Sequence, residues 1–222
     1  MRIIEPYYEF ETPLTDEYCN FMLRLIERAA RTCYKTECRI TGDLAETKAF
    51  VRKIAQVKKH ESVIEHANVT VRFVCDRGVT HELVRHRIAA FSQESTRYCN
   101  YGKDQFGNEI TVIRPPFWAD DSPEFQAWLR SCATAEREYI ELIARGRSPQ
   151  ESRSVLPNSL KTEIVMTCNL REWKHVFKMR CDKGAHPQMR QLMIPLFTEF
   201  RRCIPEIYDD IHTDIFDPQK SA

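Results

Sequence analysis

Residues 160–180 read LKTEIVMTCNLREWKHVFKMR, and they combine the two periodicities from which the fold class follows. From Leu160 to Cys168 apolar and polar side chains alternate, which is the pattern of a strand with one buried face. Asn169 then carries the side chain of a helix N-cap, and Glu172 three residues later completes a capping-box pattern. We therefore expect a strand that passes directly into a helix, which ends by Gly184.

The expected helix has a mixed face. Trp173, Val176, Phe177 and Arg180 fall at positions i, i+3, i+4 and i+7, so they share one side of the helix. A guanidinium on this face points to the interior or to a cleft, where it needs acceptors, because an unpaired buried charge is costly. Alternatively, Arg180 extends to solvent near the helix C-terminus, where the helix dipole favours a cation. The spacing alone leaves both interpretations open.

The same patterns place the other elements. They predict further strands at residues 3–4, 69–75 and 110–113, and helices at residues 16–31, 43–59, 80–88, 122–145 and 187–203. In the second helix, the buried side chains are expected to be Phe50, Val51, Ile54 and Val57. The strands are too few and too scattered for a doubly wound sheet. The sequence therefore predicts an α+β (mixed α/β) fold: one domain over residues 1–222, with a central, mostly antiparallel sheet flanked by long helices.

Composition narrows the function classes. The formal net charge is +1, so no global basic field attracts nucleic acid. No apolar run is long enough for a transmembrane helix, and no signal-peptide core is present. The nine cysteines are odd in number and form no C-x-x-C pair, which favours reduced thiols and a cytoplasmic location. The six glycines form neither G-x-G-x-x-G nor a P-loop, so side chains, above all arginines, must hold any phosphates.

Residues 85–101 read RHRIAAFSQESTRYCNY and concentrate such side chains. Arginine presents a rigid fork of donors that matches phosphate and carboxylate oxygens, and serine and threonine hydroxyls supply further donors. This segment is suited to an anion that also carries a flat, hydrogen-bonding body. Two other interpretations remain: a nucleic-acid surface, because arginines alternate with tyrosines, and a solvated charged turn.

Two kinds of catalytic site find little support in the sequence. His81 and His86 miss the H-E-x-x-H spacing by one residue, and on a helix their imidazoles would diverge by about 140°. The segment His60–His66 supplies no third ligand at a diagnostic spacing, so we expect no metal site. No cysteine has a neighbour that would lower its pKa, so we expect structural thiols rather than a nucleophile.

Several stretches together resemble the flavin-dependent thymidylate synthases. Arg85-His86-Arg87 followed by seven residues and Ser95 matches the R-H-R-x7-S signature of that family. Upstream, HESVIEH at 60–66 is similar to its H-E-[ST]-x-x-E-H element. Downstream, the family order and spacing recur in RSVLP at 153–157, NLR at 169–171, His175 and Arg180. The resemblance covers roughly residues 1–205.

This resemblance implies a function and an assembly. The family methylates dUMP to dTMP, takes the methylene from methylenetetrahydrofolate, and takes reducing equivalents from NADPH through FAD. The expected partners are thus dUMP and a folate, with neither nucleic acid nor membrane. The family is a homotetramer of mixed α/β subunits whose active sites are shared between subunits, and it uses no cysteine nucleophile.

The resemblance also implies roles for individual residues. Arg180 is similar to the catalytic arginine that binds the uracil ring. The expected dUMP-binding residues are Glu82, Arg85, Gln93, Glu94, Ser95, Thr96, Arg97, Arg153 and Arg180. The expected FAD-binding residues are His60, Ser62, Glu65, Arg85, His86, Arg87, Gln93, Asn169, Arg171 and His175.

Four positions leave questions open. Ser95 as a nucleophile is an alternative to Ser95 as a phosphate ligand. Glu82 stands where many members have glutamine, Gln93 where some have glutamate, and Cys33 where a flavin-contacting serine is found in others.

Overall fold

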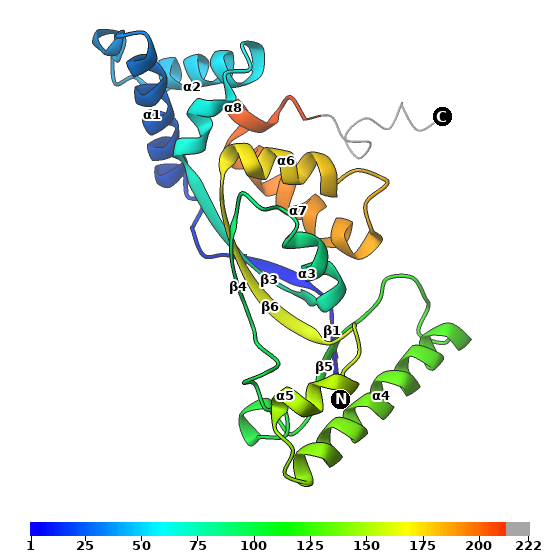
Figure 1. Ribbon diagram of the computed structural model, residues 1–222. Coiled ribbons are helices and arrows are strands. Elements are labelled where there is room, and N and C mark those ends of the chain that lie inside the picture. The colour runs from blue at the N-terminus through cyan, green and yellow to red at the C-terminus, as the bar shows by residue number, and fades with distance from the viewer. Residues whose placement is uncertain (212–222) are drawn as a thin grey trace. The chain divides into compact units, whose positions relative to one another are not determined.

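The chain forms two sheets and a set of helices. The computed structural model describes residues 1–211. One sheet is antiparallel and four-stranded, in the order β2 (Tyr7–Phe10), β3 (Asn68–Asp76), β6 (Lys161–Asn169), β4 (Ala90–Gln93) (Figure 1). The other is a parallel pair, β1 (Arg2–Ile4) with β5 (Thr111–Ile113). The predicted mixed α+β class with a mostly antiparallel sheet is confirmed.

The helices predicted at 16–31, 122–145 and 187–203 lie close to their predicted segments, whereas α5 and α8 were not predicted. Ser122 caps the fourth helix, with proline in its first turn, as its sequence predicts. The α-helices are α1 (Asp16–Cys33), α2 (Leu44–Arg52), α3 (Arg77–Leu83), α4 (Pro123–Ala144), α5 (Pro149–Ser152), α6 (Leu170–Arg180), α7 (Pro187–Cys203) and α8 (Pro205–Tyr208). Shorter 3₁₀ segments are η1 (Glu37–Arg39), η3 (Glu61–His66), η4 (Asp104–Phe106) and η5 (Arg153–Val155), and η2 (Lys53–Val57) is a π-helix.

Contacts divide the chain into two compact units. Unit 1 comprises Met1–Tyr8, Arg72–Arg85 and Phe91–Val165, and unit 2 comprises Glu9–Val71, His86–Ala90 and the chain from Met166 onward. The long strands β3 and β6 each begin in one unit and end in the other. The expectation of one domain over residues 1–222 stays a prediction.

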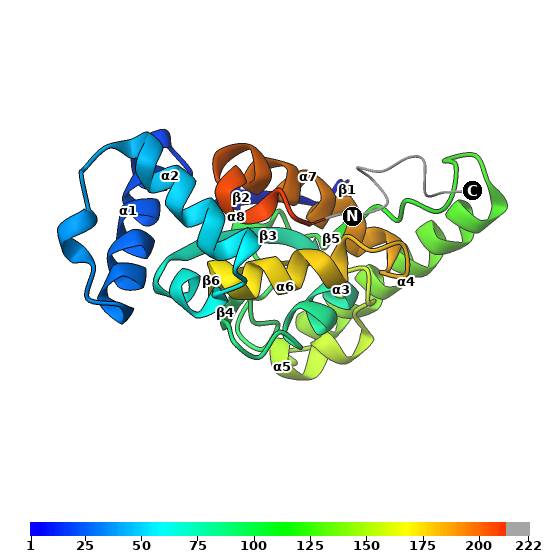
Figure 2. The same cartoon turned by 90° about the horizontal axis from the view of Figure 1, so that it is seen from above.

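Unit 2 has an aromatic core. Trp173 and Phe177 on α6 stack with ring centroids 5.6 Å apart, and Phe177 contacts Phe200 of α7 and Tyr208 of α8 at 5.0 and 5.8 Å. The polar atoms of this core are paired: the Tyr208 hydroxyl donates to the carbonyl of Leu170. Figure 2 shows α8 beside α2 and α7 in this unit. The apolar face predicted for residues 170–180 therefore builds the core and fixes the orientation of α6.

Unit 1 has a smaller core around α4. Tyr139 and Cys132 of this helix are buried against Val112 of β5, and Leu160, Ile110 and Tyr101 complete the cluster. The Tyr139 hydroxyl accepts a hydrogen bond from the backbone N–H of Tyr101. This contact fastens the segment after residue 94, which carries the predicted anion-binding turn.

The structure corrects three expectations. The helix predicted for residues 80–88 begins at Arg77, where Asp76 caps it, and ends at Leu83, so Arg85, His86 and Arg87 lie beyond its end in a turn and an irregular segment. The helix ends there because Val79 and Leu83 bury its apolar face, whereas Ile88 is exposed and offers no further buried position. The expectation that Arg85, His86 and Arg87 lie on a helix is therefore wrong.

The second correction concerns Val57, which is 71% exposed, not buried. A π-helical turn at Lys53–Val57 inserts an extra residue into the helical repeat, which moves Val57 off the buried face. The third concerns β2 and β4, which the sequence analysis missed. Each strand is only four residues long, with alternating exposed and half-buried positions, so its signal is weak.

Candidate functional site

Three side chains of unit 2 form a buried hydrogen-bonded row. The Nε of Arg180 donates to Nε2 of His86 at 3.0 Å, and Nδ1 of His86 lies 3.3 Å from a carboxylate oxygen of Glu172. His86 is 4% exposed and Glu172 8%. Arg180 is half-buried at the C-terminal end of α6, so its guanidinium is held by a specific acceptor rather than extended freely into solvent.

The hydrogen bonds define the state of His86. Because Nε2 accepts from a guanidinium, it carries no proton, so the imidazole is neutral and its proton sits on Nδ1, directed at Glu172. Burial, followed by the charges of Arg180 and His175, lowers the pKa of His86 to about 4. Burial raises the pKa of Glu172, partly offset by His175. The row therefore presents one fixed cation, on Arg180.

The same row bears on the metal hypothesis. His86, Glu172 and His175 are a group within the described part of the chain whose ligand atoms lie within 4.8 Å of one another. A metal on Nδ1 of His86 would leave Nε2 as the protonated nitrogen, which could no longer accept from Arg180. The hydrogen bond between Arg180 and His86 is therefore incompatible with a metal on Nδ1 of His86. His81, which misses the H-E-x-x-H spacing with His86 by one residue, is not a member of this group.

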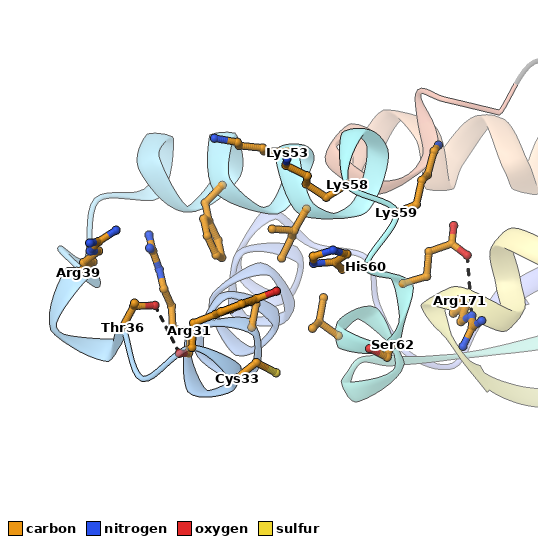
Figure 3. Close-up of a pocket in the computed structure, with 16 residues that line it drawn as sticks. Arg31, Cys33, Thr36, Arg39, Lys53, Lys58, Lys59, His60, Ser62 and Arg171 are labelled. Atoms are coloured by element: carbon orange, nitrogen blue, oxygen red, sulfur yellow. Dashed lines mark hydrogen bonds and ion pairs between the residues drawn. The ribbon is translucent and has the colours of Figure 1, made fainter.

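Unit 2 also contains two cavities that share residues. The smaller, about 460 Å³, is lined by Asn169, Arg171, His175 and Glu65, four residues that the sequence analysis assigned to FAD, as well as by Ile88 and Lys178. The larger, about 1040 Å³, is lined by His60, Ser62 and again Arg171, together with Cys33 (Figure 3). Most residues expected to contact flavin thus lie around two adjoining cavities.

A charged network forms the shared wall of these cavities. Nζ of Lys174, which is only 1% exposed, contacts Glu61 at 3.2 Å and Asp210 at 2.9 Å. Lys59 also binds Asp210. Burial raises the pKa of Asp210, but the two lysines outweigh this effect and the net shift is downward. Arg171 pairs with Glu65, so α6 and the segment 59–66 are tied together at this wall.

Unit 1 holds the predicted anion-binding turn. The backbone N–H of Arg97 donates to Oγ of Ser95, and the hydroxyl of Thr96 accepts from Arg153 at 3.4 Å. Arg97 donates to the side chain of Gln150. Thr96 and Arg153 line a cavity of about 400 Å³, whose other polar lining residues are Arg77, His81, Ser154 and Asn158. Nη1 of Arg77, one of the lining residues, is buried and has no hydrogen-bond partner among the described residues.

Other predicted nucleotide ligands in unit 1 have partners within the chain. Glu94 accepts from the Tyr101 hydroxyl and from Lys161, and the amide of Gln93 donates to the hydroxyls of Thr80 and Thr162. These contacts support the turn and the strand β4. Glu82 is half-buried on α3, and Arg85 is exposed. Arg87, a predicted FAD contact that belongs to unit 2, is exposed as well. Contacts of these five residues with dUMP or FAD stay predictions.

The pKa values of seven cysteine thiols give no support for a cysteine nucleophile. Burial raises the pKa of Cys19 and Cys181 to about 12 and that of Cys132 to about 11. The pKa values of Cys75, Cys99, Cys168 and Cys203 are also raised, with burial the largest cause in each case. A raised pKa disfavours the thiolate that a nucleophile requires. This agrees with the expectation that these thiols are structural.

Several site residues were missed by the sequence analysis. Glu172 was interpreted only as a capping residue; its N–H is indeed capped by Asn169, but its carboxylate contacts His86. Its spacing of three from His175 was the available signal, because i and i+3 lie on one helix face. Lys174, Arg77 and Gln150 gave no comparable signal, since their partners are distant in the sequence.

Comparison with known proteins identifies the chain. The Thy1 family model, described as thymidylate synthase complementing protein, matches residues 17–206. The chain belongs to this family. A relative from Mycobacterium avium, named flavin-dependent thymidylate synthase, is 34% identical over 203 residues, which covers 84% of this chain and 78% of the relative. A protein of the same name from Geobacter sulfurreducens is 34% identical over 189 residues, covering 82% and 78%.

The fold has solved counterparts. The UMP/dUMP methylase PolB from Streptomyces cacaoi, bound with 5-Br dUMP, superposes with a TM-score of 0.76 at 20% identity, covering 95% of this chain and 96% of that chain. At this identity the likeness shows the fold alone. The resemblance to the flavin-dependent thymidylate synthases is thus confirmed by the family match, and the chain is an enzyme of that family.

Among the described residues, no helix is both long and apolar enough to cross a membrane.

Proposed function

We propose that this enzyme methylates dUMP to dTMP, with methylenetetrahydrofolate as carbon donor and NADPH as reductant through bound FAD. The observation that carries the proposal is the guanidinium of Arg180, held at 3.0 Å by the neutral, buried imidazole of His86. Relatives of the same family bear the name flavin-dependent thymidylate synthase, and PolB, with the same fold, was crystallised with a dUMP analogue.

The residues around the two unit 2 cavities fit FAD. The cavities provide cations for a pyrophosphate, such as Arg171 and Lys59, hydrogen-bonding groups such as Asn169 and Ser62, and apolar surface at Ile54 and Ile88. We assign FAD binding to His60, Ser62, Glu65, Arg85, His86, Arg87, Gln93, Asn169, Arg171 and His175. When bound, the flavin supplies the reducing equivalents for the methyl group.

Arg180 has the central role in this account. Its charge, placed against N3 and O2 of the uracil ring, stabilises the negative charge that develops as C5 becomes nucleophilic. His86 orients the guanidinium by accepting a hydrogen bond from its Nε. Because the imidazole is neutral, it adds no second positive charge. Glu172 fixes this tautomer by accepting from Nδ1. No cysteine is required, in line with the raised thiol pKa values.

The nucleotide phosphate is assigned to the turn of unit 1. Thr96 and Arg153 line the unit 1 cavity, and Ser95 and Arg97 are the neighbours of Thr96 in the turn. Together the four residues supply hydroxyl, backbone and guanidinium donors. Glu82, Arg85, Gln93 and Glu94 complete the proposed set. Serine here acts as a phosphate ligand, since Ser95 accepts from the Arg97 N–H and this arrangement provides no base for a nucleophile.

The proposal includes an assembly. The enzyme is a cytoplasmic homotetramer in which residues from different subunits complete each active site. Arg85 and Arg87 support this, because both are exposed on the isolated subunit although the family signature centres on them.

Absorption spectroscopy tests the proposal at its first step. The purified protein should show a flavin spectrum near one FAD per subunit, and the spectrum should change on addition of dUMP. A colourless protein that cannot be loaded with FAD would refute the proposed function.

A further inference from the structure

A series of ion pairs crosses the sheet in unit 1 and ends beside the predicted anion-binding turn. Nη1 of Arg72 on β3 lies 3.0 Å from a carboxylate oxygen of Glu163 on β6. Nζ of Lys161, also on β6, lies 2.6 Å from the other oxygen of Glu163 and 3.0 Å from Glu94. The hydroxyl of Tyr101 donates to the second carboxylate oxygen of Glu94 at 2.7 Å. We call these five residues the Lys161 network; all of them belong to unit 1.

The strand β6 brings two members of the Lys161 network to one face of the sheet. Side chains two residues apart in a strand point to the same face, so Lys161 and Glu163 lie together, whereas Thr162 between them is buried. The backbone N–H of Glu94 donates to the carbonyl of Glu163 at 2.8 Å, which holds the residue after β4 alongside β6. The pairing of these strands therefore sets two carboxylates around one ammonium group.

Lys161 carries its charge in this position. Its side chain is 20% exposed and that of Glu94 12%, so the pair is partly shielded from water. Burial lowers the pKa of Lys161, but the carboxylates of Glu163 and Glu94 outweigh burial and the net shift of the pKa is upward. Without the ammonium group, two partly buried carboxylates would face each other, and their repulsion would push Glu94 away from the sheet.

The Lys161 network lies behind the phosphate site rather than in it. Both carboxylate oxygens of Glu94 already accept a hydrogen bond, one from Lys161 and one from Tyr101. The described residues that line the unit 1 cavity include Thr96 and Arg153 but no member of the network. The carboxylate of Glu94 thus has a structural partner at each oxygen, and it serves the nucleotide by supporting the turn.

The network holds the turn at both of its ends. Glu94 directly precedes Ser95 at one end. At the other end, Tyr101 donates its hydroxyl to Glu94 and its backbone N–H to the hydroxyl of Tyr139 on α4. Between these points the backbone N–H of Arg97 donates to Oγ of Ser95. A displacement of Glu94 would therefore move the donors that we assign to the phosphate.

We propose that Lys161 is a positioning residue: by holding Glu94 it sets the geometry of the turn, and with it the preference for a nucleotide over a nucleoside. This inference rests on the proposed function, in which the turn binds the phosphate of dUMP. In this role Lys161 touches neither dUMP nor the flavin, and the chemistry at the uracil ring depends on Arg180. Loss of Lys161 should therefore raise the KM for dUMP and leave kcat nearly unchanged.

A binding experiment tests this role without catalysis. FAD-loaded protein is titrated with dUMP and with deoxyuridine, in the wild type, Lys161→Met and Lys161→Arg. We expect Lys161→Met to weaken the binding of dUMP by about tenfold and that of deoxyuridine by less than about twofold. Lys161→Arg should retain most of the affinity, because a guanidinium can still pair with both carboxylates. Equal losses for dUMP and deoxyuridine, or unchanged binding of dUMP in Lys161→Met, would overturn the proposal.

Arg72→Met is the matched control for a purely structural effect. It removes a cation from the far end of the same network and leaves the contact between Lys161 and Glu94 in place. We expect it to lower the stability of the protein but to leave the affinity for dUMP unchanged. A loss of dUMP affinity in Arg72→Met equal to that in Lys161→Met would show that the network only stabilises the sheet, and would refute the positioning role.

Tyr101→Phe distinguishes positioning from direct contact. This variant removes the hydroxyl that holds the other oxygen of Glu94 and keeps the ring in its core. If Lys161 acts through Glu94, Tyr101→Phe also weakens dUMP more than deoxyuridine, and it does so even where Lys161→Met fails to fold. Unchanged binding in Tyr101→Phe would contradict the proposal. Wild-type protein that binds dUMP but forms no dTMP would refute the proposed function alone, because the titrations do not depend on turnover.

Discussion

The Nε of Arg180 lies 3.0 Å from Nε2 of His86, and the imidazole at that position is neutral. This pairing resolves the two interpretations that helix periodicity left open for Arg180. The guanidinium is half-buried and donates to the imidazole of His86, so it does not extend freely into solvent. It keeps its full charge while its direction is fixed, which is what stabilising a developing anion requires.

Replacing Arg180 tests this role. Arg180→Ala should lower kcat/KM for dUMP by roughly 100-fold or more, since it removes a preorganised cation. FAD content should remain near the wild-type value. Absorbance of the purified variant and initial rates of dTMP formation measure the two properties. Near-normal turnover would show that Arg180 has another role.

Glu172 should act through His86. Glu172→Ala removes the acceptor for Nδ1–H, so the imidazole can adopt the other tautomer and lose its hydrogen bond with Arg180. We expect kcat/KM for dUMP to fall by about tenfold, and Glu172→Gln to restore most of it, because its amide oxygen still accepts. Nitrogen chemical shifts of His86 would report the tautomer directly. An unchanged tautomer in Glu172→Ala would contradict this mechanism.

The lowered pKa of His86 predicts a loss of stability in acid. In the unfolded chain a histidine takes up a proton near pH 6.5, whereas in the folded protein His86 does so only near pH 4. Its contribution to stability is therefore present above pH 6.5 and is lost as the pH falls toward 4, by up to roughly 3 kcal/mol.

Unfolding by urea at several pH values, in wild type and His86→Gln, measures this contribution. The wild type should lose more free energy of unfolding between pH 7 and pH 4 than the variant, which lacks the titrating group. Parallel curves would mean that His86 is not the group responsible.

Arg153 should affect the nucleotide phosphate selectively. Arg153→Ala removes the guanidinium that contacts Thr96 at the unit 1 cavity, and we expect the KM for dUMP to rise by about tenfold. Arg137→Ala, which removes an exposed arginine of α4 paired with Glu138, is the matched control and should leave KM unchanged. Competition by inorganic phosphate should weaken in Arg153→Ala; equal inhibition in both variants would argue against phosphate binding here.

Lys174 should matter for stability. Lys174→Met removes a buried cation and leaves the half-buried carboxylates of Glu61 and Asp210 without their shared partner, which should cost about 3 kcal/mol. Lys178→Met, an exposed lysine on the same helix, should cost far less. Chemical denaturation of both variants gives the comparison, and similar stabilities would show that the network contributes little.

Local patterns predicted much of the fold. The strand and capped helix of residues 160–180 are present as expected, because alternation and capping depend on neighbouring residues. The end of α3 at Leu83 and the exposure of Val57 were not predictable in this way. Both depend on how far a buried face extends and on a π-helical turn, which are tertiary features.

The site was predictable where a motif carried it. The resemblance to the family assigned His60, Ser62, Asn169, Arg171 and His175 to FAD, and these residues line two adjoining cavities. Long-range partners were not predictable: Arg180 and His86 are 94 residues apart in the sequence, and Lys174 and Asp210 are 36 apart. Such pairs follow only from the folded chain.

Conversion of dUMP to dTMP by the FAD-loaded protein is the most direct test of the proposed function. The reaction contains methylenetetrahydrofolate and NADPH, and mass spectrometry follows the added methyl group. The account predicts dTMP only when all components are present, formed roughly 100-fold or more slowly with Arg180→Ala. Fully FAD-loaded wild-type protein that oxidises NADPH but forms no dTMP would contradict it.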